Sequence, residues 1–405
     1  MKKIIARQPI LDANNNTIAY ELLFRSIGGG NKANVVDGNA ATIEVLKGTL
    51  INFGIDKISS HKRVFINFTE DLIKMDAIEL LKKDRVVIEL LEDIFDSEEI
   101  IEKVMEYKRA GYTFALDDFT IVEEKLELLK IIDIVKVDFI EFTKDQIIET
   151  VNSVKKYNKI LLAEKVETRE EFEWAKELGF TMFQGFYFLK PEILEEETIT
   201  SVPTSYTKLL MELNKEKINF DLVAESIKQD TSLTYSFLNI VNSFAYYSRR
   251  KIDSVKDAFI RLGLKEGKRI IYINFLKTMA PNDTPGELIK KSLIRGKMAE
   301  SLASNFNIYD KREKLFLLGM FSLMSIILKK DMASILTSVP LATEIQDALL
   351  GKKNDLSNVM DLIVLNERNK MESVEKILNQ YNIDIEEFGE IYFNTIEWSD
   401  NIFEA

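Results

Sequence analysis

The sequence contains no cysteine and only one histidine among its 405 residues. Disulfide bridges, thiolate metal sites and cysteine nucleophiles are therefore excluded, and a zinc site is disfavoured because zinc ligands are mostly cysteine and histidine. The absence of cysteine is also consistent with a reducing cytoplasm, where we expect this protein to be located. The single histidine, His61, lies in a polar segment that we expect to be a solvated loop.

The chain also lacks a basic excess and a long apolar run. Lysine and arginine total 54 against 66 aspartate and glutamate, for a net charge of -12, which argues against binding a nucleic-acid polymer. No apolar stretch at the N-terminus has the character of a signal peptide. The most apolar segment, 315–328, is shorter than the roughly 20 residues that span a bilayer, so we expect a buried helix and no membrane anchor.

The first half contains short apolar strands that alternate with helices. We predict strands at 3–6, 17–25, 64–68, 85–90, 112–116, 132–137, 160–163 and 180–183, and helices at 40–53, 97–110, 124–130, 144–157 and 168–178. The turn residues at 12–16 make the first two strands a hairpin. Apolar β-branched strands that alternate with helices indicate a parallel sheet covered on both faces. Because the strand count is near eight, a closed (β/α)8 barrel is favoured over an open sheet.

The second half shows helical spacing and almost no strand pattern. Predicted helices include 220–228, 233–242, 254–263 and 267–279. We therefore predict two domains, a β/α barrel at 1–198 and an all-helical domain at 199–405.

Polar side chains stand at the carboxyl ends of the predicted strands, which meet at one rim of a β/α barrel. They are Glu21, Asn67, Glu89, Glu92, Asp117, Asp118, Lys136, Glu164, Glu167 and Gln184. A single such residue would be read as a solvated loop residue, but a whole series is improbable by chance. Carboxylates and an amide are hard oxygen ligands for Mg²⁺ or Mn²⁺, so the series predicts metal-assisted hydrolysis at phosphorus.

Lys136 has two readings of about equal weight. Among bound cations its pKa would be lowered, and it could accept a proton from an attacking water. Alternatively, it is an ion-pair partner for the surrounding acids.

The same residues carry a resemblance. The stretches 21–25 (ELLFR), 65–67 (FIN), 89–92 (ELLE), 116–119 (LDDF), 135–138 (VKVD), 163–168 (AEKVET) and 184–186 (QGF) resemble the ordered motifs of EAL domains, barrel phosphodiesterases that linearise cyclic di-GMP. The resemblance covers roughly residues 1–195. It implies the metal ligands Glu21, Asn67, Glu89, Asp117 and Asp118, with Glu167 near a second ion. It further implies Lys136 and Gln184 at the attacking water, Gln8 and Arg25 at the substrate, and Glu92 as a loop-positioning residue.

Two departures from the EAL pattern concern the metal site. After Asp118 the family has a Gly-rich loop that is associated with the second metal and with dimerisation, but this chain has Thr-Ile-Val-Glu-Glu at 120–124. The branched residues among these cannot take the backbone angles that glycine allows. Lys165 replaces a glycine beside Glu164 and could compete with a metal ion. A displacement of about 1 Å can cost a hundredfold in rate, so the altered positions predict weak or absent hydrolysis.

The second half resembles HDOD domains, helical relatives of His-Asp metal hydrolases that lack the metal residues. The matching stretches are Pro203, 227–230, 238–243 and 258–263. With no histidine after position 61, this half cannot form a His-Asp site, and we expect Asn242 to cap a helix or form buried hydrogen bonds. The resemblance implies docking of a protein partner.

These observations leave three hypotheses. We favour slightly a weak or inactive phosphodiesterase that senses cyclic di-GMP, or serves as a scaffold, and signals through its helical domain. The alternative is an active Mg²⁺- or Mn²⁺-dependent cyclic di-GMP phosphodiesterase that yields the linear dinucleotide. A third hypothesis is hydrolysis of another phosphodiester. A homodimer is a further expectation.

Overall fold

The computed structural model divides the chain into two compact units, which are described separately. The first comprises Met1–Lys190 and Asp384–Glu390, and the second comprises Pro191–Ile383 and Ile391–Ala405. The structure describes residues 3–26, 55–91, 98–117, 129–185, 187, 204–213, 215, 218–244, 252–281 and 284–403. The predicted helix at 40–53, most of that at 124–130 and the predicted domain boundary at 198 lie outside these ranges.

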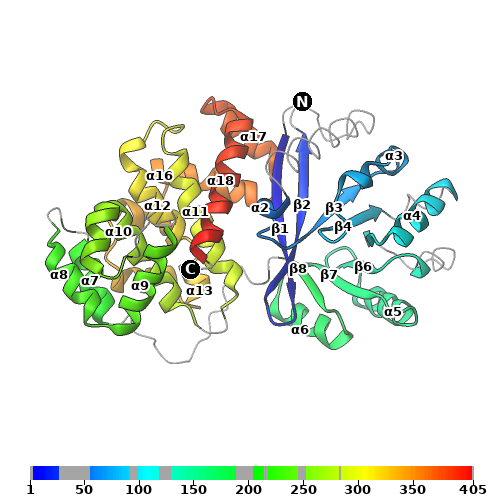
Figure 1. Cartoon of the computed structure of the whole chain (residues 1–405), viewed down its shortest axis with the longest axis horizontal. Coiled ribbons are helices and arrows are strands. Elements are labelled where there is room, and N and C mark those ends of the chain that lie inside the picture. The colour runs from blue at the N-terminus through cyan, green and yellow to red at the C-terminus, as the bar shows by residue number, and fades with distance from the viewer. Residues whose placement is uncertain are drawn as a thin grey trace. The chain divides into compact units, whose positions relative to one another are not determined.

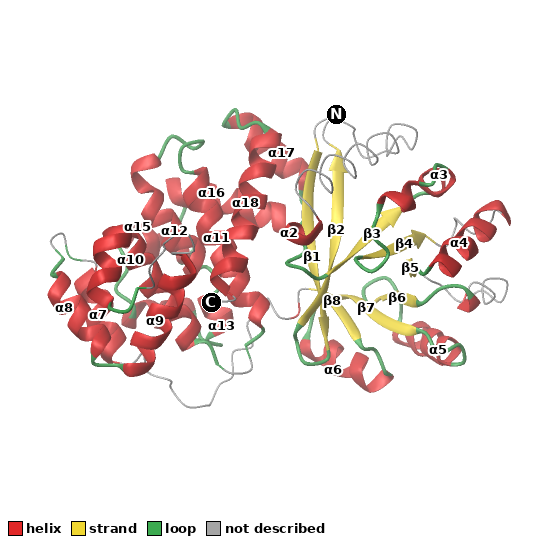
Figure 2. Ribbon diagram, viewed as in Figure 1, coloured by secondary structure: helices red, strands yellow, loops and turns green. Residues whose placement is uncertain are grey.

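The first unit contains a closed eight-stranded barrel, as the sequence predicts (Figures 1 and 2). Its strands are β1 (Lys3–Asp12), β2 (Thr17–Ser26), β3 (Arg63–Phe68), β4 (Val86–Leu91), β5 (Thr113–Asp117), β6 (Ile134–Asp138), β7 (Ile160–Val166) and β8 (Met182–Gly185). β1 and β2 form the predicted hairpin, and β1 also pairs antiparallel with β8. The pairs from β2 through β8 are all parallel.

One apolar layer fills the barrel. It contains Ile10, Ala19, Phe65, Val87, Ala115, Ile134 and Leu162, all at most 3% exposed, with Met182 packed against them. These residues come from all eight strands, one from each. Because alternate residues of a strand face the same side, the residue two positions nearer the rim also faces the interior.

Helices α4 (Glu98–Ala110), α5 (Lys144–Lys155) and α6 (Arg169–Leu178) lie outside the barrel (Figure 2). Each connects two consecutive strands in the chain. α5 and α6 both begin with a capping box. The side chain of the N-cap residue accepts a hydrogen bond from the backbone N–H of the third helical residue, and the side chain of that residue accepts one from the N-cap backbone N–H. Three short helices were not predicted: α2 (Ile55–Ile58), α3 (Glu70–Lys74) and η2 (Ala77–Leu80). Each is about one turn long, which is too short to show a helical repeat in the sequence.

All regular elements among the described residues of the second unit are helices. They are α7 (Thr204–Leu213), α8 (Phe220–Lys228), α9 (Thr231–Phe244), α10 (Val255–Met279), α11 (Gly286–Leu302), η6 (Tyr309–Lys311), α12 (Arg312–Phe321), α13 (Met324–Ile327), α14 (Met332–Ser338), α15 (Thr343–Leu349), α16 (Asp355–Glu367), α17 (Met371–Gln380) and, from Ile391 onward, α18 (Ile385–Phe403), whose first residues belong to the first unit. The two helices predicted at 254–263 and 267–279 are the two parts of α10. They meet at Gly263, whose φ of 78° and ψ of 169° are not helical.

The apolar segment 315–328 is buried, as predicted, but it is not a single helix. It forms most of α12 and all of α13, with a break at Ser322 and Leu323. Among the helices that the structure describes, none combines the length and the apolar character that a bilayer crossing requires.

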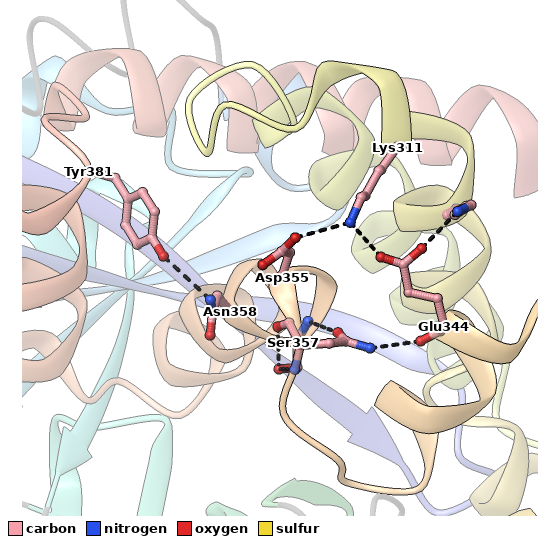
Figure 3. A network of polar contacts seen from close by, with 8 residues as sticks. Lys311, Glu344, Asp355, Ser357, Asn358 and Tyr381 are labelled. Atoms are coloured by element: carbon pink, nitrogen blue, oxygen red, sulfur yellow. Dashed lines mark hydrogen bonds and ion pairs between the residues drawn. The ribbon is translucent and has the colours of Figure 1, made fainter.

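Ion pairs of two kinds join the helices of the second unit. A buried set links α11 to α16, where Arg295 donates to both carboxylate oxygens of Glu367 at 2.9 and 2.7 Å, and Lys291 lies 3.4 Å from the same carboxylate. A more exposed set is shown in Figure 3, where Lys311 bridges Glu344 of α15 and Asp355 of α16 at 2.6 and 3.0 Å. These contacts connect helices that are distant in sequence.

Candidate functional site at the barrel rim

The side chains that face the barrel interior change from apolar to polar at one level. Two positions beyond the apolar layer lie Glu21, Asn67, Glu89, Asp117, Lys136, Glu164 and Gln184, one on each strand from β2 to β8. In the antiparallel β1 the equivalent position precedes Ile10 and is Gln8, which pairs with Glu21 across the hairpin. This polar layer therefore brings together, at one rim, residues that the sequence separates widely.

Lys136 is the centre of the polar layer. Its ammonium nitrogen Nζ lies 2.7 Å from Glu89 Oε1, 2.8 Å from Glu164 Oε1 and 3.0 Å from Asp117 Oδ1. Lys136 and Glu89 are fully buried, and the Asp117 side chain is 15% exposed. The three neighbouring strands β4, β5 and β7 thus each direct a carboxylate to one ammonium group of β6.

Glu21 forms a second set of contacts with two amides. Asn67 donates from Nδ2 to Glu21 Oε1 at 3.2 Å, and Gln184 donates from Nε2 to Glu21 Oε2. Glu21 and Gln184 are buried, whereas Asn67 is exposed. The layer is therefore open to solvent on the side of Asn67 and closed on the side of Gln184.

Burial and mutual repulsion set the protonation of this cluster. Burial, together with the neighbouring carboxylates, raises the pKa of Glu89 well above its usual value and that of Glu164 to about 8, although Lys136 opposes both shifts. Burial lowers the pKa of Lys136, but the four acids around it outweigh burial and hold it well above the usual value. Lys136 is therefore a cation in this arrangement. The sequence-based hypothesis of a lowered pKa for Lys136 assumed that metal cations are bound nearby. The contacts of Lys136 with Glu89, Asp117 and Glu164 are those of the other hypothesis, an ion-pair partner for the acids.

The resemblance implies a divalent metal ion, and the donor chemistry of the polar layer fits one. Glu89 Oε2 and Gln184 Oε1 are buried oxygens without a hydrogen-bond partner, which is costly unless a further group satisfies them. Carboxylate and amide oxygens are the ligands that Mg²⁺ and Mn²⁺ prefer. Among the described residues, however, no group of three or more acids or histidines is placed to hold a metal ion. Lys136 lies where three of the carboxylates converge. Metal binding would require these acids to turn from Lys136.

A bulge in β7 creates a second ion pair at the rim. The register of β7 with β8 shifts between Ala163 and Val166, and Lys165 within the bulge has a φ of +52°. Its Nζ contacts Oδ2 of Asp138, a completely buried residue two positions beyond Lys136 on β6. The bulge also packs tightly on Gly185, where an added Cβ would come within 2.1 Å of the Val166 carbonyl oxygen. The sequence indicated a competing cation at Lys165, but its contact with Asp138 was not predicted.

The remaining predicted residues differ in what the structure describes. Asp118 and Glu92 lie outside the described residues, and so does the 120–124 loop. Arg25 is part of β2 and pairs with Ile4, but its side chain is not described. The backbone N–H of Glu167 donates to Glu171 Oε2 at 2.8 Å, so the cap of α6 fixes the backbone at this position.

In the second unit, Asn242 forms hydrogen bonds within the protein, as predicted. Its Nδ2 donates to the carbonyl oxygens of Leu238 at 2.7 Å and Ile252 at 2.9 Å, and its Oδ1 accepts from the Ile252 N–H at 2.9 Å. Asn242 therefore joins the end of α9 to the segment that precedes α10. This use of all its hydrogen-bonding groups is structural.

The fold and the polar rim define a class of protein in which a β/α barrel precedes an all-helical domain. The EAL domain model matches residues 5–191, and the HDOD domain model matches residues 199–348. The uncharacterized protein YuxH of Bacillus subtilis (strain 168) is 37% identical over 412 residues, which cover 100% of both chains. The chain belongs to the family of proteins that join an EAL domain to an HDOD domain, and the predicted resemblance is thereby confirmed.

Two further similar proteins are linked to cyclic di-GMP, one by its name and one by the ligand in its solved structure. The cyclic di-GMP phosphodiesterase CdgJ of Vibrio cholerae is 29% identical over 98% of this chain and 92% of that protein. Among solved structures, Klebsiella pneumoniae BlrP1 with manganese and cyclic di-GMP is 24% identical, with a TM-score of 0.37, over 46% of this chain and 55% of that one.

Proposed function

We propose that this protein is a cyclic di-GMP signalling protein whose barrel binds the dinucleotide at the polar rim and hydrolyses it only weakly. The observation that carries the proposal is the convergence of Glu21, Asn67, Glu89, Asp117 and Lys136 on one level of the barrel. The family assignment and the likeness to CdgJ over nearly the whole chain support cyclic di-GMP as the ligand.

Mg²⁺ or Mn²⁺ would be held by Glu21, Asn67, Glu89 and Asp117, with Asp118 as a further ligand, and would supply electrostatic stabilisation at the phosphoryl group and an activated water. Gln184 orients Glu21 through its amide, and Lys136 holds Glu89, Asp117 and Glu164 around one point. Gln8 stands opposite Glu21 at the rim. We assign Gln8 and Arg25 to substrate binding, Glu167 to the reacting centre and Glu92 to loop positioning.

Two features support weak rather than efficient turnover. Lys136 has to share its three carboxylates with any metal ion, and Lys165 adds a second cation at the rim. Metal catalysis depends on coordination number and geometry, so competition for the ligands lowers the rate. The completeness of the polar layer favours the second candidate function, an efficient phosphodiesterase.

The helical unit would pass the state of the barrel to a protein partner. The HDOD match supports this role, and the lack of histidine beyond position 61 excludes a His-Asp metal site in this unit. We also propose that a protein partner binds the helical unit and that the chain forms the homodimer expected from the sequence.

The test is calorimetric titration of the full chain with cyclic di-GMP and Mn²⁺, followed by chromatographic detection of the linear product. We expect binding with slow product formation, and loss of binding in Glu21→Ala but not in Glu344→Gln of the helical unit. Turnover matching that of efficient phosphodiesterases would favour the second candidate. Absence of both binding and product would refute both and leave a scaffold.

A further inference from the structure

We propose that Lys165 is a built-in cation that occupies Asp138 and restricts the barrel rim to a single divalent ion. The inference rests on the metal-binding part of the proposed function and adds a property of this chain's own residues. It is based on a contrast between two parts of the rim. The inner part keeps unsatisfied oxygens although Lys136 lies among its acids, whereas both oxygens of Asp138 in the outer part are engaged.

The inner part of the rim has buried polar atoms that are free to bind a ligand. Glu89 is completely buried, and its Oε2 has no hydrogen-bond partner. Gln184 is 3% exposed, and its Oε1 also has none. Buried polar groups are nearly always satisfied, so these two atoms indicate a cationic or hydrogen-bonding ligand at the level of Glu21, Glu89 and Asp117.

The outer part of the rim is different because both oxygens of Asp138 are already engaged. Asp138 faces the interior above Lys136, since Ile134, Lys136 and Asp138 alternate along β6 and Ile134 belongs to the apolar layer. Its Oδ1 accepts from the N–H groups of Ile140 at 2.7 Å and Glu141 at 2.9 Å. Its Oδ2 contacts the ammonium group of Lys165. This carboxylate is compensated without a metal ion.

Lys165 reaches Asp138 at a conformational cost. Its φ of +52° places it in the left-handed region, which side chains other than those of glycine, asparagine and aspartate rarely adopt. The β7 bulge imposes this conformation and at the same time turns the ammonium group toward β6, where Asp138 is the register partner of Glu164. Backbone strain of this kind persists where the surroundings demand it and commonly marks functional positions.

The consequence is electrostatic. A second divalent ion at Asp138 would have to displace the ammonium group of Lys165, whose side chain is 54% exposed, or lie beside it and be repelled. The ion pairs described for Glu89, Asp117 and Glu164 are with Lys136 and not with Lys165. Lys165 thus excludes an ion from the outer position. The inner position, where Glu89 Oε2 and Gln184 Oε1 lack a partner, is left to one ion that competes with Lys136 for the acids.

The experiment counts Mn²⁺ ions bound to the full chain without nucleotide, by electron paramagnetic resonance of free Mn²⁺ and by calorimetry. We expect one ion per unmodified chain. Lys165→Gly, which suits the left-handed backbone, should bind two, with at least a tenfold gain in affinity at the second position. Lys165→Ala provides a second variant if the first fails to fold, as judged by circular dichroism.

Two controls define the role of Asp138. Lys176→Ala, in which a surface lysine of α6 is removed, should still bind one ion. The double variant Lys165→Gly with Asp138→Asn should return to one, because the freed carboxylate is then absent.

A count of zero or two in the unmodified chain, or of one in folded Lys165→Gly, overturns the proposal. Such a result would leave cyclic di-GMP binding, measured separately, as the test of the proposed function.

Discussion

Lys136 is buried, and its ammonium group is surrounded by three carboxylates within 3.0 Å. A buried charge is tolerated only when it is paired, and here one cation neutralises part of the repulsion among several acids. The same group therefore stabilises the metal-free barrel. Under the proposed function it would also stand beside the reacting phosphate.

Replacing Lys136 with alanine should destabilise the metal-free barrel. The change leaves buried carboxylates without their shared cation, for which a loss of about 3 kcal/mol in the free energy of unfolding is expected. Urea denaturation in the presence of a chelator measures it, and Mn²⁺ should restore part of the loss. Lys176→Ala is the matched control, since the ion pair of Lys176 with Glu173 is partly exposed and should contribute less than about 1 kcal/mol. Equal losses in the two variants would contradict this account.

At this scale, the sequence predicted which residues meet but not their charge states. The alternation of side chains along a strand places Glu21, Asn67 and Glu89 at one level once a barrel is assumed. Whether Lys136 loses or gains proton affinity depends on the balance between burial and acids a few ångströms away, and no spacing rule contains that balance. The contact between Lys165 and Asp138 depends on a bulge that the sequence did not reveal.

Two helices around the barrel are stabilised at their N-terminal ends by side-chain caps. Both α5 and α6 begin with a capping box, at Thr143 with Gln146 and at Thr168 with Glu171. Glu171 also accepts from the N–H of Glu167. The cap of α6 therefore holds a predicted site residue, whereas the cap of α5 does not.

Thr168→Ala and Thr143→Ala should each lower the free energy of unfolding of the barrel by about 1 kcal/mol, which is typical of a lost N-cap. Only Thr168→Ala should also weaken cyclic di-GMP binding, by a few fold, because it loosens the backbone at Glu167. Chemical denaturation and calorimetric titration of both variants test this pair. An equal effect on affinity would show that the cap of α6 has no special connection to the site.

In the second unit, the buried pair between α11 and α16 should govern acid stability. Burial raises the pKa of Glu367, but Arg295 and Lys291 outweigh burial and leave it below its usual value. The stability from this pair is therefore complete above the unfolded pKa of about 4.3 and is lost as the pH falls through the lower folded pKa.

Glu367→Gln should cost about 3–5 kcal/mol at neutral pH and should weaken the pH dependence of stability in the acid range. Glu344→Gln, in the more exposed network of Figure 3, should cost less than about 1 kcal/mol. Urea denaturation of both variants as a function of pH provides the comparison. A steep acid dependence that survives in Glu367→Gln would assign it to other carboxylates.

The elements themselves were largely predictable from periodicity. The eight strands and the two parts of α10 follow from apolar patterns and glycine positions. The short helices α2, α3 and η2, and the break between α12 and α13, escaped prediction because one helical turn shows no repeat and tertiary packing decides where an apolar run bends. The structural role of Asn242 was predictable because the side chain of asparagine favours hydrogen bonds to nearby backbone groups.

On the scale of the whole molecule, two units each have their own core. We expect two unfolding transitions in the full chain, which Lys136→Ala and Glu367→Gln would assign to the barrel and the helical unit. Cyclic di-GMP with Mn²⁺ at a hundred times the dissociation constant should stabilise the barrel by about 2.7 kcal/mol and leave the other transition in place. Scanning calorimetry with and without ligand measures this, and a shift confined to the helical unit would place the nucleotide site elsewhere.

The reversed direction of β1 determines where added sequence would emerge. Since β1 runs against the seven parallel strands, Lys3 lies on the side of the polar layer and the turn at 13–16 lies at the opposite mouth. A purification tag joined ahead of Lys3 would emerge beside the polar layer and would obstruct the nucleotide site proposed there. For binding assays, a tag is better joined to the helical end of the chain.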